Sequence, residues 1–145
     1  MSDLKKVIVY TDGSALNNGN SERETCCGWA YKLMDVDGNE RKASGSDTGK
    51  TNNRMEMTAV LNAMKAITDK NVPVEVYSDS QYVVNTMNGE FAIHENKDLW
   101  AEIMDEKEKF SNITFYWVKG HDKNEHNNEV DNMARQEAGK LQECK

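Results

Sequence analysis

The fold is decided by residues 53–78, where a helical pattern is followed by a strand. Residues 53–67 read NRMEMTAVLNAMKAI, and residues 73–78 read PVEVYS. In the first stretch the large apolar side chains recur every three or four positions, which is typical of an amphipathic helix of about four turns. The second is a short run with β-branched residues after a proline. A strand that is reached through a helix pairs in parallel with an earlier strand, so the sequence predicts an α/β fold.

Three strand-like segments lie upstream of this helix and predict an antiparallel meander. Residues 6–11 form a β-branched and aromatic run that ends at residues 12–14 (DGS), so we expect a buried strand that is stopped by a turn. Residues 28–34 and 40–45 are the next two segments. The Asp-Gly pair at residues 37–38 favours a hairpin turn between them.

The downstream pattern adds two helices, one strand and a closing helix. A short helix capped at residues 79–80 is followed by an amphipathic helix with apolar positions from 99 to 110. Residues 113–118 predict a strand, and apolar positions from 130 to 141 mark the closing helix. The order βββαβααβα predicts a mixed sheet with helices on its faces. A chain of 145 residues is expected to form one domain, residues 1–145.

The composition predicts a folded, polar protein. Hydrophobic residues make up 37% of the chain and charged residues 30%. No run approaches the roughly 18 apolar residues that a membrane helix needs, and the first residues lack the apolar run of a signal peptide. We therefore expect a cytoplasmic protein that does not act on membranes. Three cysteines, two of them adjacent, imply neither a disulfide framework nor a metal site, and we expect free thiols.

Four acidic residues occupy special places in this map. Asp12 ends the first strand, Glu56 lies in the first turn of the first long helix, Asp79 ends the fourth strand, and Asp131 lies one turn into the closing helix. Strand ends form a crevice where a sheet changes its pairing, so Asp12 and Asp79 are expected to face each other there. Four converging carboxylates repel one another unless cations lie between them, and Mg²⁺ or Mn²⁺ suits hard oxygen ligands. Taken singly, each acid has the simpler interpretation of a cap at a strand or helix end.

Four short segments around these acids resemble the motif series of the type I ribonuclease H family. They are residues 10–14 (YTDGS), 51–56 (TNNRME), 78–83 (SDSQYV) and 117–121 (WVKGH), the last followed ten residues later by Asp131. The resemblance covers nearly the whole chain, with order and spacing intact. It implies the ribonuclease H-like fold, a five-stranded mixed sheet with three antiparallel and then two parallel strands, flanked by helices.

The resemblance also implies an activity and a role for each acid. The expected enzyme is a metal-dependent endonuclease that hydrolyses the RNA strand of RNA–DNA hybrids by two-metal-ion catalysis, leaving 5′-phosphate and 3′-hydroxyl ends. Asp12 would bridge two Mg²⁺ ions, Glu56 and Asp79 would hold the leaving-group metal, and Asp131 the nucleophile metal, with Mn²⁺ as a substitute ion. His121 would assist proton transfer or product release, a role that suits a side chain that titrates near neutral pH.

Five polar residues match positions at which the family binds its substrate: Asn18, Thr51, Asn52, Asn53 and Gln81. The four amides suit recognition of the RNA 2′-hydroxyl, because each offers both a donor and an acceptor. Thr51, with Arg54 as a helper, resembles the part of the family's groove that grips phosphate.

The chain departs from many family members after the short helix that follows Asp79. Where those members insert a basic helix and loop, this chain has only residues 89–96, and residues 90–110 carry 3 lysines against 7 acids. The net charge of −7 by itself argues against an anionic partner, but the two Mg²⁺ ions that the resemblance implies would add +4 and leave −3. We therefore expect a monomeric variant without the basic handle, which binds hybrids weakly and loses activity steeply as salt rises.

Two other functions stay open at this point. Within the same fold, the chain could cleave another duplex such as double-stranded RNA, or act beside a polymerase, because the amides can read RNA without showing that the opposing strand is DNA. The other alternative is a non-catalytic binder of divalent ions or hybrids. The presence of all four acids together with His121 argues against that binder.

Overall fold

The computed structural model describes residues 6–16, 26–119 and 125–139. Asn18 and His121 lie outside these ranges. Within them the chain forms five strands and four helices, in the order β1 (Val7–Leu16), β2 (Cys26–Asp35), β3 (Glu40–Thr48), α1 (Asn52–Ala66), β4 (Val74–Ser78), α2 (Gln81–Met87), α3 (Lys97–Lys107), β5 (Ile113–Trp117) and α4 (Glu125–Gly139).

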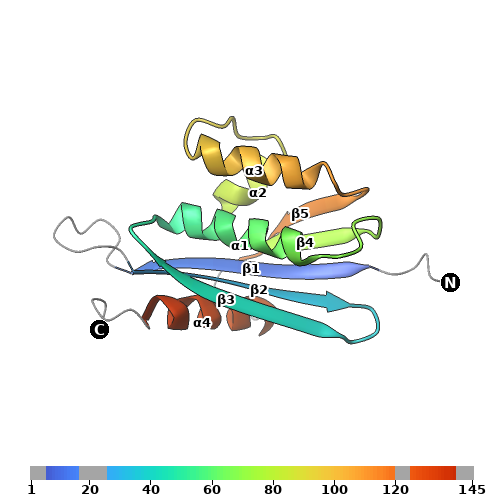
Figure 1. Cartoon of the computed structure of the whole chain (residues 1–145), viewed down its shortest axis with the longest axis horizontal. Coiled ribbons are helices and arrows are strands. Elements are labelled where there is room, and N and C mark those ends of the chain that lie inside the picture. Colours follow the sequence, from blue (N-terminus) through green and yellow to red (C-terminus); the bar gives the residue numbers. More distant parts are fainter. Residues whose placement is uncertain (1–5, 17–25, 120–124, 140–145) are drawn as a thin grey trace.

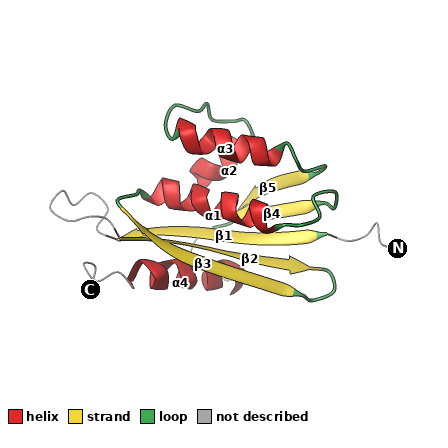
Figure 2. Cartoon of the chain, in the orientation of Figure 1, coloured by secondary structure: helices red, strands yellow, loops and turns green. Residues whose placement is uncertain are grey.

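The five strands form one mixed sheet in the order β3-β2-β1-β4-β5. The β1–β2 and β2–β3 pairs are antiparallel, and the β1–β4 and β4–β5 pairs are parallel. Helices α1, α2 and α3 lie on one face of the sheet and α4 lies on the other (Figures 1 and 2). This arrangement confirms the predicted fold class.

Two hydrophobic clusters join the layers. The larger lies between the sheet and the α1–α3 layer and includes the fully buried side chains of Val9, Met57 and Trp100. The smaller consists of Tyr10, Ala30, Val130 and Ala134 and joins α4 to β1 and β2. Neighbours Val9 and Tyr10 thus face opposite layers, as the alternation of side chains along a strand requires.

The prediction that a turn at residues 12–14 stops the first strand is wrong. Residues 12–14 continue β1 and pair with residues 28–30 of β2. The parallel pairing with β4, in contrast, ends at the Thr11–Ser78 pair. Asp12 therefore lies just beyond the point where β4 leaves β1. The sequence does not predict that β1 continues through residues 12–14, because Asp-Gly-Ser is typical of a turn. The pairing with β2 depends on a segment that is distant in the sequence.

The closing helix also begins earlier than its apolar positions indicate. α4 starts at Glu125, so Asp131 falls in its second turn, which agrees with its predicted place one turn into the helix. The first turn is polar, and apolar periodicity cannot detect a polar turn.

Residues 88–96 connect α2 to α3 without a helix, which confirms that this segment lacks the basic handle.

The cysteines differ in their state. Cys26 is disulfide-bonded, so the prediction of three free thiols is wrong. The buried Cys27 donates from Sγ to the carbonyl oxygen of Lys50 at 3.4 Å. Cys144 lies outside the described residues. An odd number of cysteines does not show from sequence alone which of them pair.

Among the helices described here, none has the length and apolar character to cross a membrane.

Candidate active site

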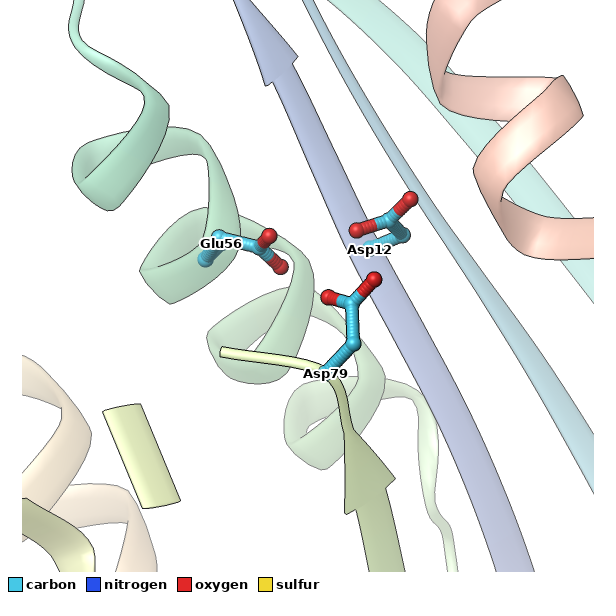
Figure 3. A group of neighbouring side chains, drawn as sticks. All are labelled: Asp12, Glu56 and Asp79. Atoms are coloured by element: carbon cyan, nitrogen blue, oxygen red, sulfur yellow. The ribbon is translucent and has the colours of Figure 1, made fainter. Parts of the chain in front are cut away.

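Asp12, Glu56 and Asp79 form a compact carboxylate cluster. Each offers an oxygen that lies within 4.8 Å of an oxygen of the other two. They come from β1, from α1 and from the residue that follows β4, and Figure 3 shows their side chains pointing toward one another. The crevice predicted between the diverging β1 and β4 strands therefore exists, and it is acidic.

Gly13 lets α1 approach β1 closely enough to build this cluster. A Cβ atom at position 13 would collide with the backbone of Met55 and Glu56, and would lie 2.7 Å from the Met55 Cβ. The glycine after Asp12 thus permits the contact that brings Glu56 to Asp12. The start of α1 is set by Thr51, whose hydroxyl accepts from the Arg54 backbone N–H at 3.2 Å. Glu56 accordingly falls just after the first turn, not within it as predicted.

The backbone around Asp79 is held by its neighbours. The Trp117 indole Nε1 donates to the carbonyl oxygen of Asp79 at 3.1 Å. The Ser80 hydroxyl caps α2 by accepting from the Val83 backbone N–H at 3.2 Å. The sequence indicated the cap but not the indole contact, because Trp117 belongs to a motif 38 residues away.

The fourth acid, Asp131, lines the same cleft and contacts Asp12, but it is not one of the three acids whose oxygens all lie within 4.8 Å of one another. α4 crosses β2 at Gly28, where a Cβ atom would collide with the carbonyl oxygen of Ala134. This close crossing brings Asp131 to the cleft. Its Oδ1, however, accepts a hydrogen bond from Arg135 Nε at 3.2 Å. Sequence reasoning missed Arg135, although its position four residues after Asp131 on a helix signals an ion pair.

The cleft has a volume of about 360 Å³ and is lined by Asp12, Gly13, Ser14, Ala15, Asn52, Glu56, Asp79, Asp131 and Arg135. Of the predicted substrate residues, Asn52 thus lies with the carboxylates. Asn53 instead lines a neighbouring cavity of about 500 Å³ with Tyr82, Phe91 and His94 among others. The structure therefore separates the two adjacent amides.

Of the remaining predicted substrate residues that the structure describes, Thr51 and Gln81 lie at helix starts. Thr51 and Gln81 are exposed, at the cap of α1 and at the first residue of α2. Arg54 is engaged elsewhere, since both of its terminal nitrogens donate to the Asp98 carboxylate at 3.0 and 3.1 Å. That pair joins α1 to α3 and engages Arg54 in the substrate-free structure.

Burial and crowding raise the pKa values of the clustered acids. Burial, the contact with Asp131 and the charge of Asp79 raise the pKa of Asp12 to about 9. Burial and the charges of Asp12 and Asp79 raise the pKa of Glu56 well above its usual range. Burial is also the main cause that raises the pKa of Asp79. Without a cation Asp12 therefore retains its proton at neutral pH.

The donor set fits a hard divalent cation. The Oδ2 atom of Asp12 and the Oε1 atom of Glu56 are buried and accept no hydrogen bond from the described residues. Buried carboxylate oxygens without partners are unfavourable, and a cation that prefers oxygen ligands would satisfy both. The cluster is therefore a candidate metal site.

The comparisons with known proteins agree with this geometry. The RNase H family model matches residues 4–139. The chain belongs to the RNase H family. Ribonuclease H of Prosthecochloris aestuarii is 38% identical, and the alignment covers 91% of this chain and 94% of that relative. Ribonuclease H of Ehrlichia canis is 36% identical, with 95% and 98% covered. The structure of LC11-RNase H1 in complex with an RNA/DNA hybrid is 25% identical, with a TM-score of 0.74 over 92% of this chain and 97% of that one.

Proposed function

We propose that this chain is a ribonuclease H, an endonuclease that hydrolyses the RNA strand of RNA–DNA hybrids and leaves 5′-phosphate and 3′-hydroxyl ends. The cluster of Asp12, Glu56 and Asp79, with Asp131 in the same cleft, carries this proposal. Membership of the RNase H family supports it, as does a family structure with an RNA/DNA hybrid.

The four carboxylates have the chemistry to hold two Mg²⁺ ions, which would supply an activated water and neutralise the departing oxygen of an in-line displacement. The protein's own contribution is to arrange the ligands before the substrate arrives. Gly13 allows Glu56 to meet Asp12, and Trp117 holds the peptide of Asp79. Because the pKa values of these acids are raised, the carboxylates release protons as cations bind.

Substrate recognition is proposed to rest on the amides. Asn52 in the cleft and Asn53 in the neighbouring cavity offer donors and acceptors for the 2′-hydroxyl of RNA. Gln81 at the start of α2 is proposed to do the same. Asn18 and His121 keep the substrate-binding and proton-transfer roles that the resemblance implies, as predictions.

The test is cleavage of labelled substrates in Mg²⁺, comparing an RNA–DNA hybrid with duplex RNA and duplex DNA. We expect cleavage of the RNA strand of the hybrid alone. Because a catalytic metal contributes several kcal/mol, Asp79→Asn should lower the rate about a hundredfold or more. Preferred cleavage of duplex RNA would favour the alternative nuclease. Full activity of Asp12→Asn would contradict the metal-dependent mechanism.

Several finer assignments stay predictions from the sequence. They are Mg²⁺ as the working ion with Mn²⁺ as a substitute, a cytoplasmic location, a monomeric state and a single domain over residues 1–145. Rates measured in each metal, together with the mass of the protein in solution, would test the first and the third.

A further inference from the structure

Arg135 is a basic side chain in an acidic cleft. Among the described residues that line this cleft, four are acids and Arg135 is the one base. Its Nε atom donates to Asp131 Oδ1 at 3.2 Å, one helical turn away on α4. Its two terminal nitrogens hydrogen-bond to no residue in the described part of the chain. The free edge of the guanidinium is therefore available to another partner.

The pair between Arg135 and Asp131 is one that a cation can open. The Arg135 side chain is 54% exposed, and solvent-exposed ion pairs at this spacing hold weakly. A divalent ion carries twice the charge of a guanidinium and coordinates carboxylate oxygens directly. Binding of a metal to Asp131 would thus displace Arg135 without disturbing the helix.

We infer that Arg135 exchanges partners during the cycle: it neutralises Asp131 in the metal-free protein and binds a phosphate of the nucleic acid once the cleft holds cations. This inference rests on the proposed function. A guanidinium suits the second role because its planar fork matches two phosphate oxygens at once. Arg135 is thus a substrate-binding residue whose release is coupled to metal binding.

A phosphate contact by Arg135 matters for substrate affinity, because the segments expected to bind phosphate offer little positive charge. Residues 90–110, which replace the basic handle, carry 3 lysines against 7 acids. Arg54 is held by Asp98. Arg135 therefore supplies positive charge at the cleft, where the phosphate backbone must approach, and phosphate contacts dominate affinity for nucleic acids.

The first experiment measures KM and kcat for hybrid cleavage in Mg²⁺ at several KCl concentrations, for wild type, Arg135→Gln and Arg135→Lys. We expect Arg135→Gln to raise KM about tenfold, as for a lost hydrogen bond to a charged group, with kcat within about twofold of wild type. The slope of log KM against log salt should fall by about one. Arg135→Lys should restore the slope but only part of the affinity.

The matched control is Arg41→Gln, which removes the same charge from an exposed position on β3, away from the cleft. It should leave KM and the salt slope as in wild type. A wild-type KM and slope in Arg135→Gln would overturn the inference, as would a loss of kcat at unchanged KM.

The second experiment tests the exchange without catalysis, by calorimetric titration of Mg²⁺ into the protein in the absence of substrate. Because Arg135 competes with the metal for Asp131, Arg135→Gln should bind Mg²⁺ about two- to fivefold more tightly than wild type and Arg41→Gln. Equal or weaker Mg²⁺ binding would contradict the exchange. If wild type cleaves no hybrid, the proposed function fails, whereas a cleaving wild type with an unaffected Arg135→Gln defeats this inference alone.

Discussion

Asp12 is a buried carboxyl beside two other acids, and this environment sets its titration. Its pKa is raised from 3.8 to about 9, chiefly by burial. Between about pH 4 and pH 9, Asp12 in the folded, metal-free protein therefore keeps a proton that it has lost in the unfolded chain. Such a group favours folding most at low pH, and its contribution is lost as the pH rises from about 4 toward 9.

Asp12→Asn should consequently stabilise the metal-free protein. The amide cannot ionise, so it removes the free-energy cost of keeping Asp12 protonated in the folded cluster. A gain of about 1 kcal/mol corresponds to about 3 °C in melting temperature for a domain of this size. The advantage over wild type should grow between pH 5.5 and pH 9. Melting curves in EDTA at several pH values measure this.

The control for this prediction is Asp105→Asn, the same change at an exposed position on α3. It should leave the melting temperature unchanged at every pH. Mg²⁺ should raise the melting temperature of wild type by mass action, and raise that of Asp12→Asn less. A melting temperature of Asp12→Asn at or below wild type in EDTA would mean that the acids do not repel one another.

At the scale of elements, the position of α4 depends on its contact with Gly28 of β2. A Cβ atom at Gly28 would meet the Ala134 carbonyl oxygen, and the Glu137 Cβ would lie 2.9 Å away. Gly28→Ala should therefore push α4 off the sheet and destabilise the protein by about 1–3 kcal/mol, as overpacking does. Because Asp131 moves with α4, hybrid cleavage should also fall. Chemical unfolding and initial rates test the two effects.

Gly139→Ala is the matched control, because a Cβ atom there meets nothing within 4 Å and the position lies on the same helix. It should be neutral in stability and activity. Equal stability of the two variants would show that α4 does not rest on this contact.

α4 is also held to the sheet by a buried lysine. Lys32 Nζ lies 2.7 Å from Glu129 Oε1, 3.1 Å from His126 Nδ1 and 3.4 Å from Glu40 Oε2. Lys42 Nζ contacts the other oxygen of Glu129, also at 2.7 Å. The Lys32 side chain is only 6% exposed, but that of Lys42 is 44% exposed. The two lysines thus make the same contact in different surroundings.

Lys32→Met should cost about 1–3 kcal/mol of stability, because Lys32 is buried and its loss removes a partner from both Glu40 and Glu129. Lys42→Met should cost less than about 0.5 kcal/mol, because an exposed pair contributes little. Both lysines lower the pKa of Glu129 below its usual 4.5. Their contribution is therefore complete above that value and is lost as the pH falls below it. Unfolding curves at pH 7 and pH 4 test this, and equal costs for the two variants would contradict it.

These elements also show what the sequence could predict. Apolar periodicity located α1 almost to the residue, and the order of elements predicted the mixed sheet. The end of β1 was predicted wrongly because it depends on a partner: residues 12–14 extend the strand by pairing with β2. The polar first turn of α4, in which His126 contacts Lys32, precedes the apolar positions that mark this helix in the sequence. In the site, the motifs located the acids. The hydrogen bond from Trp117 to the carbonyl oxygen of Asp79 is a tertiary contact, which no local sequence pattern predicts.

At the scale of the whole molecule, the distribution of charge disfavours binding of an anionic substrate. The net charge is −7, and residues 61–145 carry 10 basic against 16 acidic side chains. Two of these acids, Glu90 and Glu95, line the cavity that Asn53 shares with Phe91 and His94. If Asn53 reads the hybrid, these carboxylates lie close to phosphates and raise KM.

Replacing both of these acids, Glu90→Gln with Glu95→Gln, should lower KM for the hybrid about three- to tenfold at 50 mM KCl, with kcat unchanged. The gain should disappear near 0.5 M KCl, because the Debye length then falls to about 4 Å. The control removes the same charge at Asp105 on α3 and at Glu108, the residue that caps the end of α3, with Asp105→Asn and Glu108→Gln. Both residues are exposed and lie outside that cavity. Since screening limits charge effects to about 10 Å at 0.1 M salt, the control should gain less. An equal decrease in KM for the two double variants would mean that net charge determines affinity for the hybrid. An unchanged KM in both would mean that the hybrid binds away from this cavity.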